Sequence, residues 1–201
     1  MYSPYAGRFL LSPTRSDDNH DFHDLLPDTL KQAAVLIGFV NRNGEDHIVL
    51  IQRAFHLNHH PGQVAFPGGR FEPEVDHDLI DTAIRETFEE TGIVCERRQV
   101  LGNLSPIKTV SGYQVTPFVA NFDPNFAVKI DEGEVHHLFE APANWLLNPK
   151  NVKTFTYLRF GKQRRVFAIP YENYTIWGAT AQMLKSLSEQ VWHSHFCPRS
   201  L

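Results

Sequence analysis

Three glutamates lie close together in the segment that ends at Gly92, and their spacing suits chemistry with a metal ion. Glu86 precedes Glu89 by three residues and Glu90 by four. On a helix this spacing brings side chains onto one face within about one turn. Like charges so placed destabilise a bare helix by ~0.2–0.5 kcal/mol per pair, a cost that a bound divalent cation would reverse, and Mg²⁺ prefers oxygen ligands of this kind. The spacing suits a metal site, but taken alone it favours a solvent-exposed acidic surface, and the surrounding residues must decide between the two.

The helix that must carry these carboxylates is predicted over residues 78–91. Its apolar side chains recur at intervals of three and four residues, as expected for a helix with one buried face. These residues are Ile80, Ala83, Ile84, Thr87 and Phe88. Gly92 supplies the usual stop, and acidic residues around Asp78 place negative charge near the positive end of the helix dipole. Arg85 lies four residues before Glu89, so its side chain can reach and orient that carboxylate.

Together with the loop before it, this helix resembles the signature of a known enzyme family. The glycine pair Gly68-Gly69 is followed by an acidic loop and then by the order Arg-Glu-x-x-Glu-Glu-x-Gly-Ile over residues 85–93. This order resembles the Nudix box, GX5EX7REUXEEXGU, of the Nudix hydrolases. The loop is two residues longer than the family spacing. The family's loop glutamate therefore has two candidates here, Glu72 and Glu74.

The resemblance implies an α/β fold, a Nudix-type α/β/α sandwich with a mixed central sheet, and hydrolysis of a nucleoside diphosphate linkage with bound Mg²⁺ or Mn²⁺. The metal ligands that it implies are Glu86, Glu89, Glu90 and the Gly69 carbonyl. The catalytic residues that it implies are Arg85, Glu89 and Glu134. Arg85 would orient a glutamate, and Glu134 would act as general base or as a further ligand. Glu132 is the alternative for that role, and a solvated turn acid is the simpler interpretation of Glu134.

A second resemblance covers the segment that leads into the glycine pair. It is similar to the signature of coenzyme A pyrophosphatases within the Nudix family, LLTxR-[SA]-xxx-R-xxx-G-xxx-FPGG. The positions in register are Arg53, Ala54, Gly62 and Phe66-Pro67-Gly68-Gly69. The substrate-binding residues that it implies are Arg53, Gly62, Phe66, Gly68 and Gly69.

Two positions depart from that signature, and they leave the substrate open. Ile51 replaces the threonine, and Asn58 replaces the second arginine. Asparagine lacks the charged fork that arginine presents to a phosphate, although His59 and His60 are candidates for a partial substitute. Coenzyme A, cleaved to 3′,5′-ADP and 4′-phosphopantetheine, is the first predicted substrate. The alternatives are a nucleoside triphosphate, a dinucleotide or a nucleotide sugar, or a non-catalytic Nudix domain that senses a nucleotide.

The remaining elements are expected to build the sheet around this site. Apolar runs at residues 33–40 and 47–53 flank Asn43-Gly44, whose positive φ values suit a tight hairpin turn. Further strands are predicted at residues 63–66, 99–104 and 113–122, and a strand followed by a short helix is predicted within residues 129–147. A second hairpin is predicted at residues 152–157 and 165–169, and a closing helix at residues 174–187. Residues 1–32 are expected to form an N-terminal surface arm, and residues 33–201 a single Nudix hydrolase domain.

Composition narrows the class of protein. The chain has 201 residues, of which 42% are hydrophobic, which suits one domain with a substantial core. A net charge of −4 argues against a general nucleic-acid binder. Cys95 and Cys197 are too few for a disulfide framework, and the longest aliphatic run is too short to span a membrane. We expect a soluble cytoplasmic protein that binds a small nucleotide diphosphate, with no nucleic-acid or membrane partner and with a homodimer left open.

Overall fold

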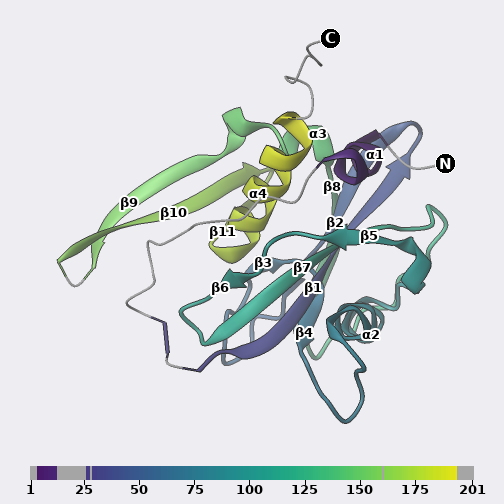
Figure 1. Cartoon of the computed structure of the whole chain (residues 1–201), viewed down its shortest axis with the longest axis horizontal. Helices are drawn as coiled ribbons and strands as arrows, with labels where there is room; N and C mark the ends of the chain where they lie inside the picture. Colours follow the sequence, from purple (N-terminus) through teal and green to yellow (C-terminus); the bar gives the residue numbers. More distant parts are fainter. Residues whose placement is uncertain (1–3, 13–25, 28, 160, 194–201) are drawn as a thin grey trace.

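A mixed sheet of eight strands forms the centre of the protein (Figure 1). The computed structural model describes residues 4–12, 26–27, 29–159 and 161–193. Strand β1 (Lys31–Arg42) pairs in parallel with β7 (Tyr113–Asn121) and antiparallel with β2 (Glu45–Arg53). The other strands are β3 (Val64–Ala65) and β8 (Val135–Pro142) on β2, β4 (Gly68–Arg70) on β1, and β5 (Val100–Asn103) and β6 (Ile107–Lys108) on β7. The predicted mixed central sheet is therefore confirmed, whereas β6 lies between the predicted strands at residues 99–104 and 113–122, where no strand was predicted.

The first hairpin forms as its turn residues predict. Asn43 and Gly44 connect β1 to β2 with φ values of 54° and 92°. The Asn41 side chain supports the turn, because its Oδ1 accepts a hydrogen bond from the Gly44 amide at 3.0 Å. Both strands run through the core, with Leu36 and Val49 on one face of the sheet and Ile37 and Leu50 on the other.

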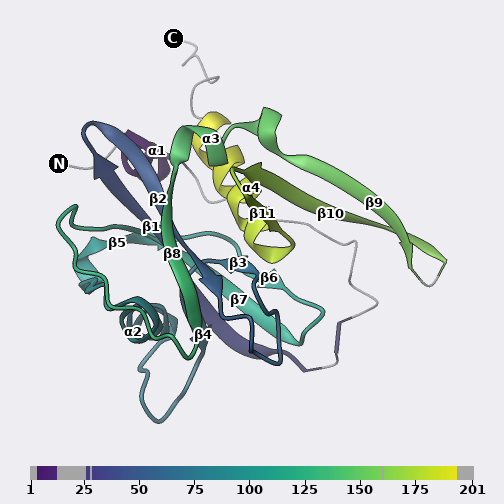
Figure 2. The ribbon, with the colours of Figure 1, turned by 180° about the vertical axis from the view of Figure 1, so that it is seen from behind.

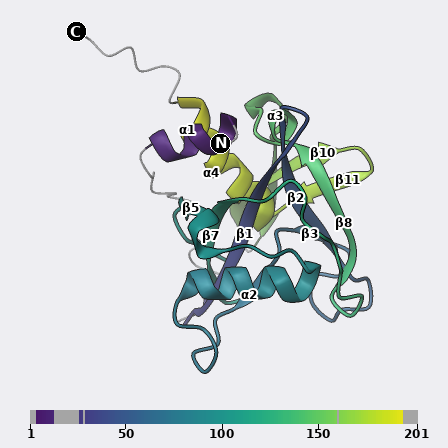
Figure 3. The same ribbon diagram turned by 90° about the vertical axis from the view of Figure 1, so that its right-hand side faces the viewer.

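One face of the sheet is covered by α2 (Leu79–Thr91), which Figure 3 shows running beneath the strands. Both predicted ends are confirmed. The Asp78 side chain accepts hydrogen bonds from the amides of the first turn, and Gly92 ends the helix with φ 72°. The predicted apolar stripe is wrong at Phe88, whose side chain is 55% exposed. The stripe is confirmed at Ala83 and Thr87, which are buried together with Thr82, Glu90 and Thr91.

The opposite face is covered by α4 (Ala179–His193) and α1 (Pro4–Leu11), and Ile169 and Ile176 of a second sheet join the same core cluster (Figure 2). This sheet consists of β9 (Lys153–Arg159), β10 (Lys162–Tyr171) and β11 (Tyr174–Trp177). The β9–β10 hairpin confirms the predicted one. The closing helix begins later than predicted, because β11 occupies the start of that segment and Gly178, with φ 65°, separates the strand from the helix. Helices on both faces confirm the predicted sandwich.

The N-terminal segment contributes to the core more than a surface arm would. In α1, the side chains of Ala6 and Phe9 are buried in the same cluster as those of α4. The Tyr5 amide also donates a hydrogen bond to the Asp46 carboxylate at 2.8 Å. Residues 13–25 of the predicted arm and Cys197 lie outside the described residues. The predicted division into residues 1–32 and 33–201 stays a prediction.

Short helices complete the described chain. The strand and short helix predicted within residues 129–147 are confirmed as β8 and α3 (Ala143–Leu146). Two 3-10 turns, η2 (Arg97–Gln99) and η3 (Pro149–Asn151), precede β5 and β9. Arg97 in η2 pairs with Asp78 and Asp81, so it ties the start of α2 to this turn. None of the described helices is long and apolar enough to cross a membrane.

Candidate active site

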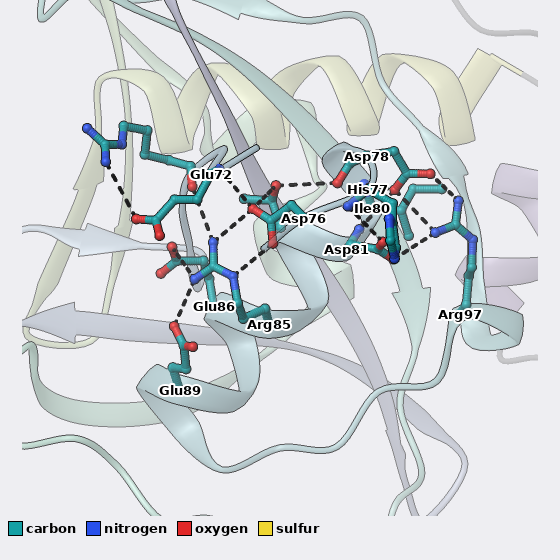
Figure 4. A network of polar contacts seen from close by, with 12 residues as sticks. Glu72, Asp76, His77, Asp78, Ile80, Asp81, Arg85, Glu86, Glu89 and Arg97 are labelled. Carbon is teal, nitrogen blue, oxygen red and sulfur yellow. Dashed lines mark hydrogen bonds and ion pairs between the residues drawn. The ribbon is translucent and has the colours of Figure 1, made fainter. Parts of the chain in front are cut away.

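The Arg85 side chain is the centre of a network of carboxylates (Figure 4). Its Nη1 donates hydrogen bonds to Glu86 Oε1 and to Glu89 Oε2, each at 2.9 Å. Its Nε and Nη2 donate to the two oxygens of Asp76, at 2.8 Å and 3.0 Å. The predicted contact between Arg85 and Glu89 is therefore present, and the same guanidinium also holds Glu86.

Asp76 is a residue that the sequence did not single out for this role. Glu72 and Glu74 were the candidates for the acidic loop position, yet Arg85 pairs with Asp76. The Asp76 carboxylate is buried, and it also accepts hydrogen bonds from the Glu72 amide at 3.0 Å and from Thr82 Oγ1 at 2.8 Å. The Arg85 bonds lower the pKa of Asp76 to about 2, against the effect of burial. Asp76 precedes Arg85 by nine residues, one more than the family spacing, so the longer loop conceals it.

The glycine pair lets the backbone approach Glu86 and β1 closely. A Cβ on Gly69 would collide with the Glu86 carboxylate. Gly68 has φ 153°, and a Cβ there would collide with the carbonyl oxygen of Ala34 in β1. Burial raises the pKa of Glu86, Arg85 lowers it, and the charges of Glu89 and Glu134 raise it further. The Glu86 carboxylate therefore lies against the backbone of Gly69, in reach of other acids.

Glu90 is the most deeply buried acid of this group, with 2% of its side chain exposed. Its Oε2 accepts a hydrogen bond from the Gly68 amide at 3.0 Å. Its Oε1 accepts no hydrogen bond from the described residues and lies 3.7 Å from Arg53 Nη1. Burial raises the pKa of Glu90 to about 8, while Gly68 and Arg53 lower it and the charges of Glu86 and Glu134 raise it. A buried carboxylate oxygen without a hydrogen bond is costly unless a charge compensates it.

Glu134 reaches the same site from the loop before β8. Its carbonyl oxygen accepts a hydrogen bond from the Ala54 amide at 2.8 Å, at the end of β2. The negative charge of Glu134 raises the pKa of both Glu86 and Glu90. The same loop is joined to the end of α2, since the Asp131 amide donates to the Glu90 carbonyl at 3.0 Å. The fold therefore brings Glu134 to the glutamates of α2, about 45 residues earlier in the chain.

The predicted substrate-binding residues lie in three different places. Arg53, Gly68 and Gly69 lie at the carboxylates through the contacts described above. Gly62 lies on the loop after β2, where its carbonyl accepts a hydrogen bond from Gln52 Nε2 at 3.2 Å. Phe66, by contrast, is buried in the core on the α4 side of the sheet, where its side chain serves packing, and its role in substrate binding stays a prediction.

Comparison with known proteins identifies the family. Residues 30–158 match the NUDIX domain. The chain belongs to the Nudix hydrolase family. The uncharacterized Nudix hydrolase NudL of Yersinia pestis (strain Pestoides F) is 39% identical over 189 residues, which cover 94% of each protein. The NudL protein of Yersinia pseudotuberculosis serotype O:1b (strain IP 31758) has the same identity and coverage.

Solved structures show that the fold is that of Nudix proteins. The MutT protein of Methanosarcina mazei Go1 superposes with a TM-score of 0.54 and 17% identity, over 86% of this chain and 99% of that protein. A MutT/nudix family protein of Enterococcus faecalis superposes with a TM-score of 0.51 and 16% identity, over 88% of this chain and 64% of that protein. The mixed sheet with helices on both faces is thus the Nudix fold.

Nudix hydrolases generally use divalent metal ions, and the donor set of this chain fits such an ion. Among the described residues, no three His, Cys, Asp or Glu side chains converge closely enough in their observed rotamers to hold one. Arg85 binds both Glu86 and Glu89. Glu89 is exposed, and the Glu90 Oε1 atom has no hydrogen bond among the described residues. Carboxylate oxygens are the ligands that Mg²⁺ and Mn²⁺ prefer.

Proposed function

We propose that this Nudix hydrolase cleaves the diphosphate linkage of a nucleoside diphosphate derivative with bound Mg²⁺ or Mn²⁺, and that coenzyme A is its first candidate substrate. One observation carries the proposal: two acids of α2 lie at the glycine pair, Glu86 against Gly69 and the buried Glu90 bonded to the Gly68 amide. Glu86, Glu89 and Glu90 come from α2, and Glu134 comes from the loop before β8. In a purely structural acidic surface, we would not expect Glu90 to be buried while one of its carboxylate oxygens lacks a hydrogen bond.

In the proposed site, Glu86, Glu89, Glu90 and the Gly69 carbonyl would hold the cation. A bound divalent cation neutralises charge on the phosphate oxygens as the bond breaks. Arg85 sets the positions of Glu86 and Glu89, because one guanidinium nitrogen binds both. Asp76 in turn fixes the plane of that guanidinium through two hydrogen bonds.

The hydrolysis step needs a base near the carboxylates. A water oxygen forms a bond to one phosphorus, the bridging phosphorus–oxygen bond breaks, and the leaving phosphate takes the electron pair of that bond. Glu134 is the proposed acceptor of the water proton. It is an exposed acid whose charge acts on both Glu86 and Glu90, which supports its place at the reacting atoms. Glu132 is the alternative.

The choice of coenzyme A rests on the resemblance of residues 53–69 to the coenzyme A pyrophosphatase signature. Arg53 supports it, since this residue lies at the carboxylates, 3.7 Å from Glu90. Asn58 argues for weaker binding, because no guanidinium stands at that position. The second candidate is another nucleoside diphosphate derivative, such as a nucleoside triphosphate, a dinucleotide or a nucleotide sugar. The predicted cytoplasmic location and the lack of nucleic-acid or membrane partners stay predictions, and a homodimer stays open.

A substrate panel tests this proposal. Purified protein is incubated with coenzyme A, nucleoside triphosphates, dinucleoside polyphosphates and nucleotide sugars, with Mg²⁺ or Mn²⁺, and the products are separated by chromatography. The expected result is release of 3′,5′-ADP and 4′-phosphopantetheine from coenzyme A. Turnover of another member alone would favour the second candidate. Binding without turnover of any member would favour a nucleotide-sensing domain instead.

A further inference from the structure

The ring of Phe55 stands out on the loop that follows β2. Its side chain is 61% exposed, although it lies one residue after Ala54, which is buried. A single exposed aromatic residue is common on protein surfaces and means little alone. The contacts that hold this ring, and its place beside the carboxylates, distinguish it from such a residue.

Two neighbours hold the ring in place. Gly62 has φ 67°, and a Cβ built on it would lie 2.5 Å from the Cε1 atom of Phe55, so the ring packs directly on the Gly62 backbone. The Gln52 side chain anchors Gly62 from β2. On another side, the His136 ring lies 4.9 Å from the Phe55 ring, centroid to centroid, at an interplanar angle of 72°. The ring is therefore fixed while most of its surface faces solvent.

The ring also lies beside the proposed reaction site. Arg53 pairs with Val135 where β2 meets β8, two strands that run side by side in Figure 2. Glu134 and His136 flank Val135, and Ala54 binds the Glu134 carbonyl. Consecutive Cα atoms are about 3.8 Å apart, so the Phe55 backbone lies within about 8 Å of that of Arg53. A ligand whose phosphates reach Arg53 and Glu134 can therefore place its next group over Phe55.

We propose that the Phe55 ring, supported by Gly62 and His136, is a stacking surface for the nucleobase of the substrate. This inference rests on the proposed function, because it assigns the nucleoside end of the same ligand. Every nucleobase has a π-face that stacks on an aromatic ring, and such stacking tolerates different bases. Purines stack over a larger area than pyrimidines, so a purine derivative is the preferred ligand class, to which the adenine of the proposed coenzyme A substrate belongs. Gly62 is then required because a side chain there would displace the ring.

Binding of two ligands that cannot be hydrolysed tests this assignment. The first is α,β-methylene-ADP, and the second is methylenediphosphonate, which has the same bridged phosphates without the nucleoside. Both are titrated with Mg²⁺ into the full-length protein by calorimetry. Phe55→Ala is expected to lower the affinity for the first ligand by about 10-fold or more and to change the affinity for the second by less than about 2-fold. Phe55→Trp is expected to retain affinity for both.

A matched control separates stacking from the general loss of an exposed aromatic ring. Phe155 on β9 is 58% exposed and belongs to the second sheet, so Phe155→Ala should change neither affinity. Equal affinity of Phe55→Ala and Phe155→Ala for α,β-methylene-ADP would overturn the assignment. So would an equal loss for both ligands in Phe55→Ala, or no binding of α,β-methylene-ADP by the wild-type protein.

The outcome is also distinguishable from failure of the proposed function. Suppose that the wild-type protein hydrolyses no diphosphate, but that Phe55→Ala selectively weakens the binding of α,β-methylene-ADP. The proposed hydrolysis then fails and the stacking surface stands. If the protein hydrolyses a diphosphate and Phe55→Ala binds α,β-methylene-ADP like the wild type, the hydrolysis stands and the stacking surface fails.

Discussion

Asp76 and Arg85 form a two-point ion pair beside the carboxylates of α2, with hydrogen bonds of 2.8 Å and 3.0 Å. Bidentate pairs of this kind fix a guanidinium in both position and plane. The remaining donor of Arg85, Nη1, then has one orientation in which it binds Glu86 and Glu89 together. An acid of the loop thereby controls where two proposed metal ligands lie.

Asp76→Asn should lower both stability and turnover. The amide keeps the shape of the carboxylate but removes its charge, and breaking one partner of a buried pair costs about 3–5 kcal/mol. The pKa of Asp76 is lowered from 3.8 to about 2, so the pair contributes stability above about pH 4 that is lost as the pH falls through 2. Urea unfolding at pH 7 and at pH 2.5 measures this. A loss in Asp76→Asn that is as large at pH 2.5 as at pH 7 would contradict the assignment.

Gly69→Ala should disrupt the site through a single methyl group. The added Cβ would collide with the Glu86 carboxylate and force it away from the backbone. We expect kcat/KM to fall by about 100-fold or more, with the fold retained by circular dichroism. Gly7→Ala is the control, since a Cβ there meets no atom within 4 Å. Normal activity of Gly69→Ala would show that Glu86 does not need its observed position.

Glu134→Gln should lower kcat more than it changes KM. A general base acts mainly in the transition state and typically supplies about 10²–10⁴-fold. The pH–rate profile of the variant should lose the limb that belongs to the base. Glu132→Gln is the paired control, because Glu132 lies on the same loop. An unchanged kcat in Glu134→Gln together with a large loss of kcat in Glu132→Gln would assign the role of general base to Glu132.

Several of these features are predictable from the sequence because a local signal determines them. The ends of α2 follow from the Asp78 cap and the left-handed Gly92, and the first hairpin follows from Asn43-Gly44. The spacing of the three glutamates also needs no tertiary information, since a helix places them together. The general position of Glu134 follows from the resemblance alone, because no local pattern ties it to a helix about 45 residues away.

Other features depend on contacts that no local pattern encodes. The buried face of α2 is rich in threonines, and Thr87 Oγ1 satisfies itself by donating to the Ala83 carbonyl at 2.6 Å. Because threonines are polar, the buried face of α2 does not stand out as an apolar stripe in the sequence. The periodicity of the apolar residues therefore assigned Phe88 to the buried face, although it is exposed. Asp76 was missed because the loop is longer than the family spacing, and only the folded loop shows which acid meets Arg85. Phe66 was assigned to the substrate from its motif, whereas the sheet buries it.

Asn58→Arg tests the choice of substrate. An arginine at this exposed loop position would add a charge-assisted contact to a phosphate, worth about 1.5–3 kcal/mol when well formed. If coenzyme A is the substrate, its KM should fall by about 10-fold or more, and kcat should change less because the contact is remote from the attacked phosphorus. No improvement for coenzyme A, with better turnover of a nucleotide that lacks the 3′-phosphate, would promote the second candidate.

The central claim is that the carboxylates of α2 hold the cation that hydrolysis requires, and Glu90 offers its most direct test. The measurement is the rate of coenzyme A hydrolysis across a titration of Mg²⁺, for the wild type, Glu90→Gln and Glu189→Gln. Glu189 is an acid on α4 that pairs with Lys185, so its variant controls for the general loss of a negative charge. We predict saturable Mg²⁺ dependence in the wild type and in Glu189→Gln, and a loss of at least about 100-fold in Glu90→Gln at limiting Mg²⁺. Wild-type rates in Glu90→Gln at limiting Mg²⁺, or turnover by the wild type in excess chelator, would contradict it.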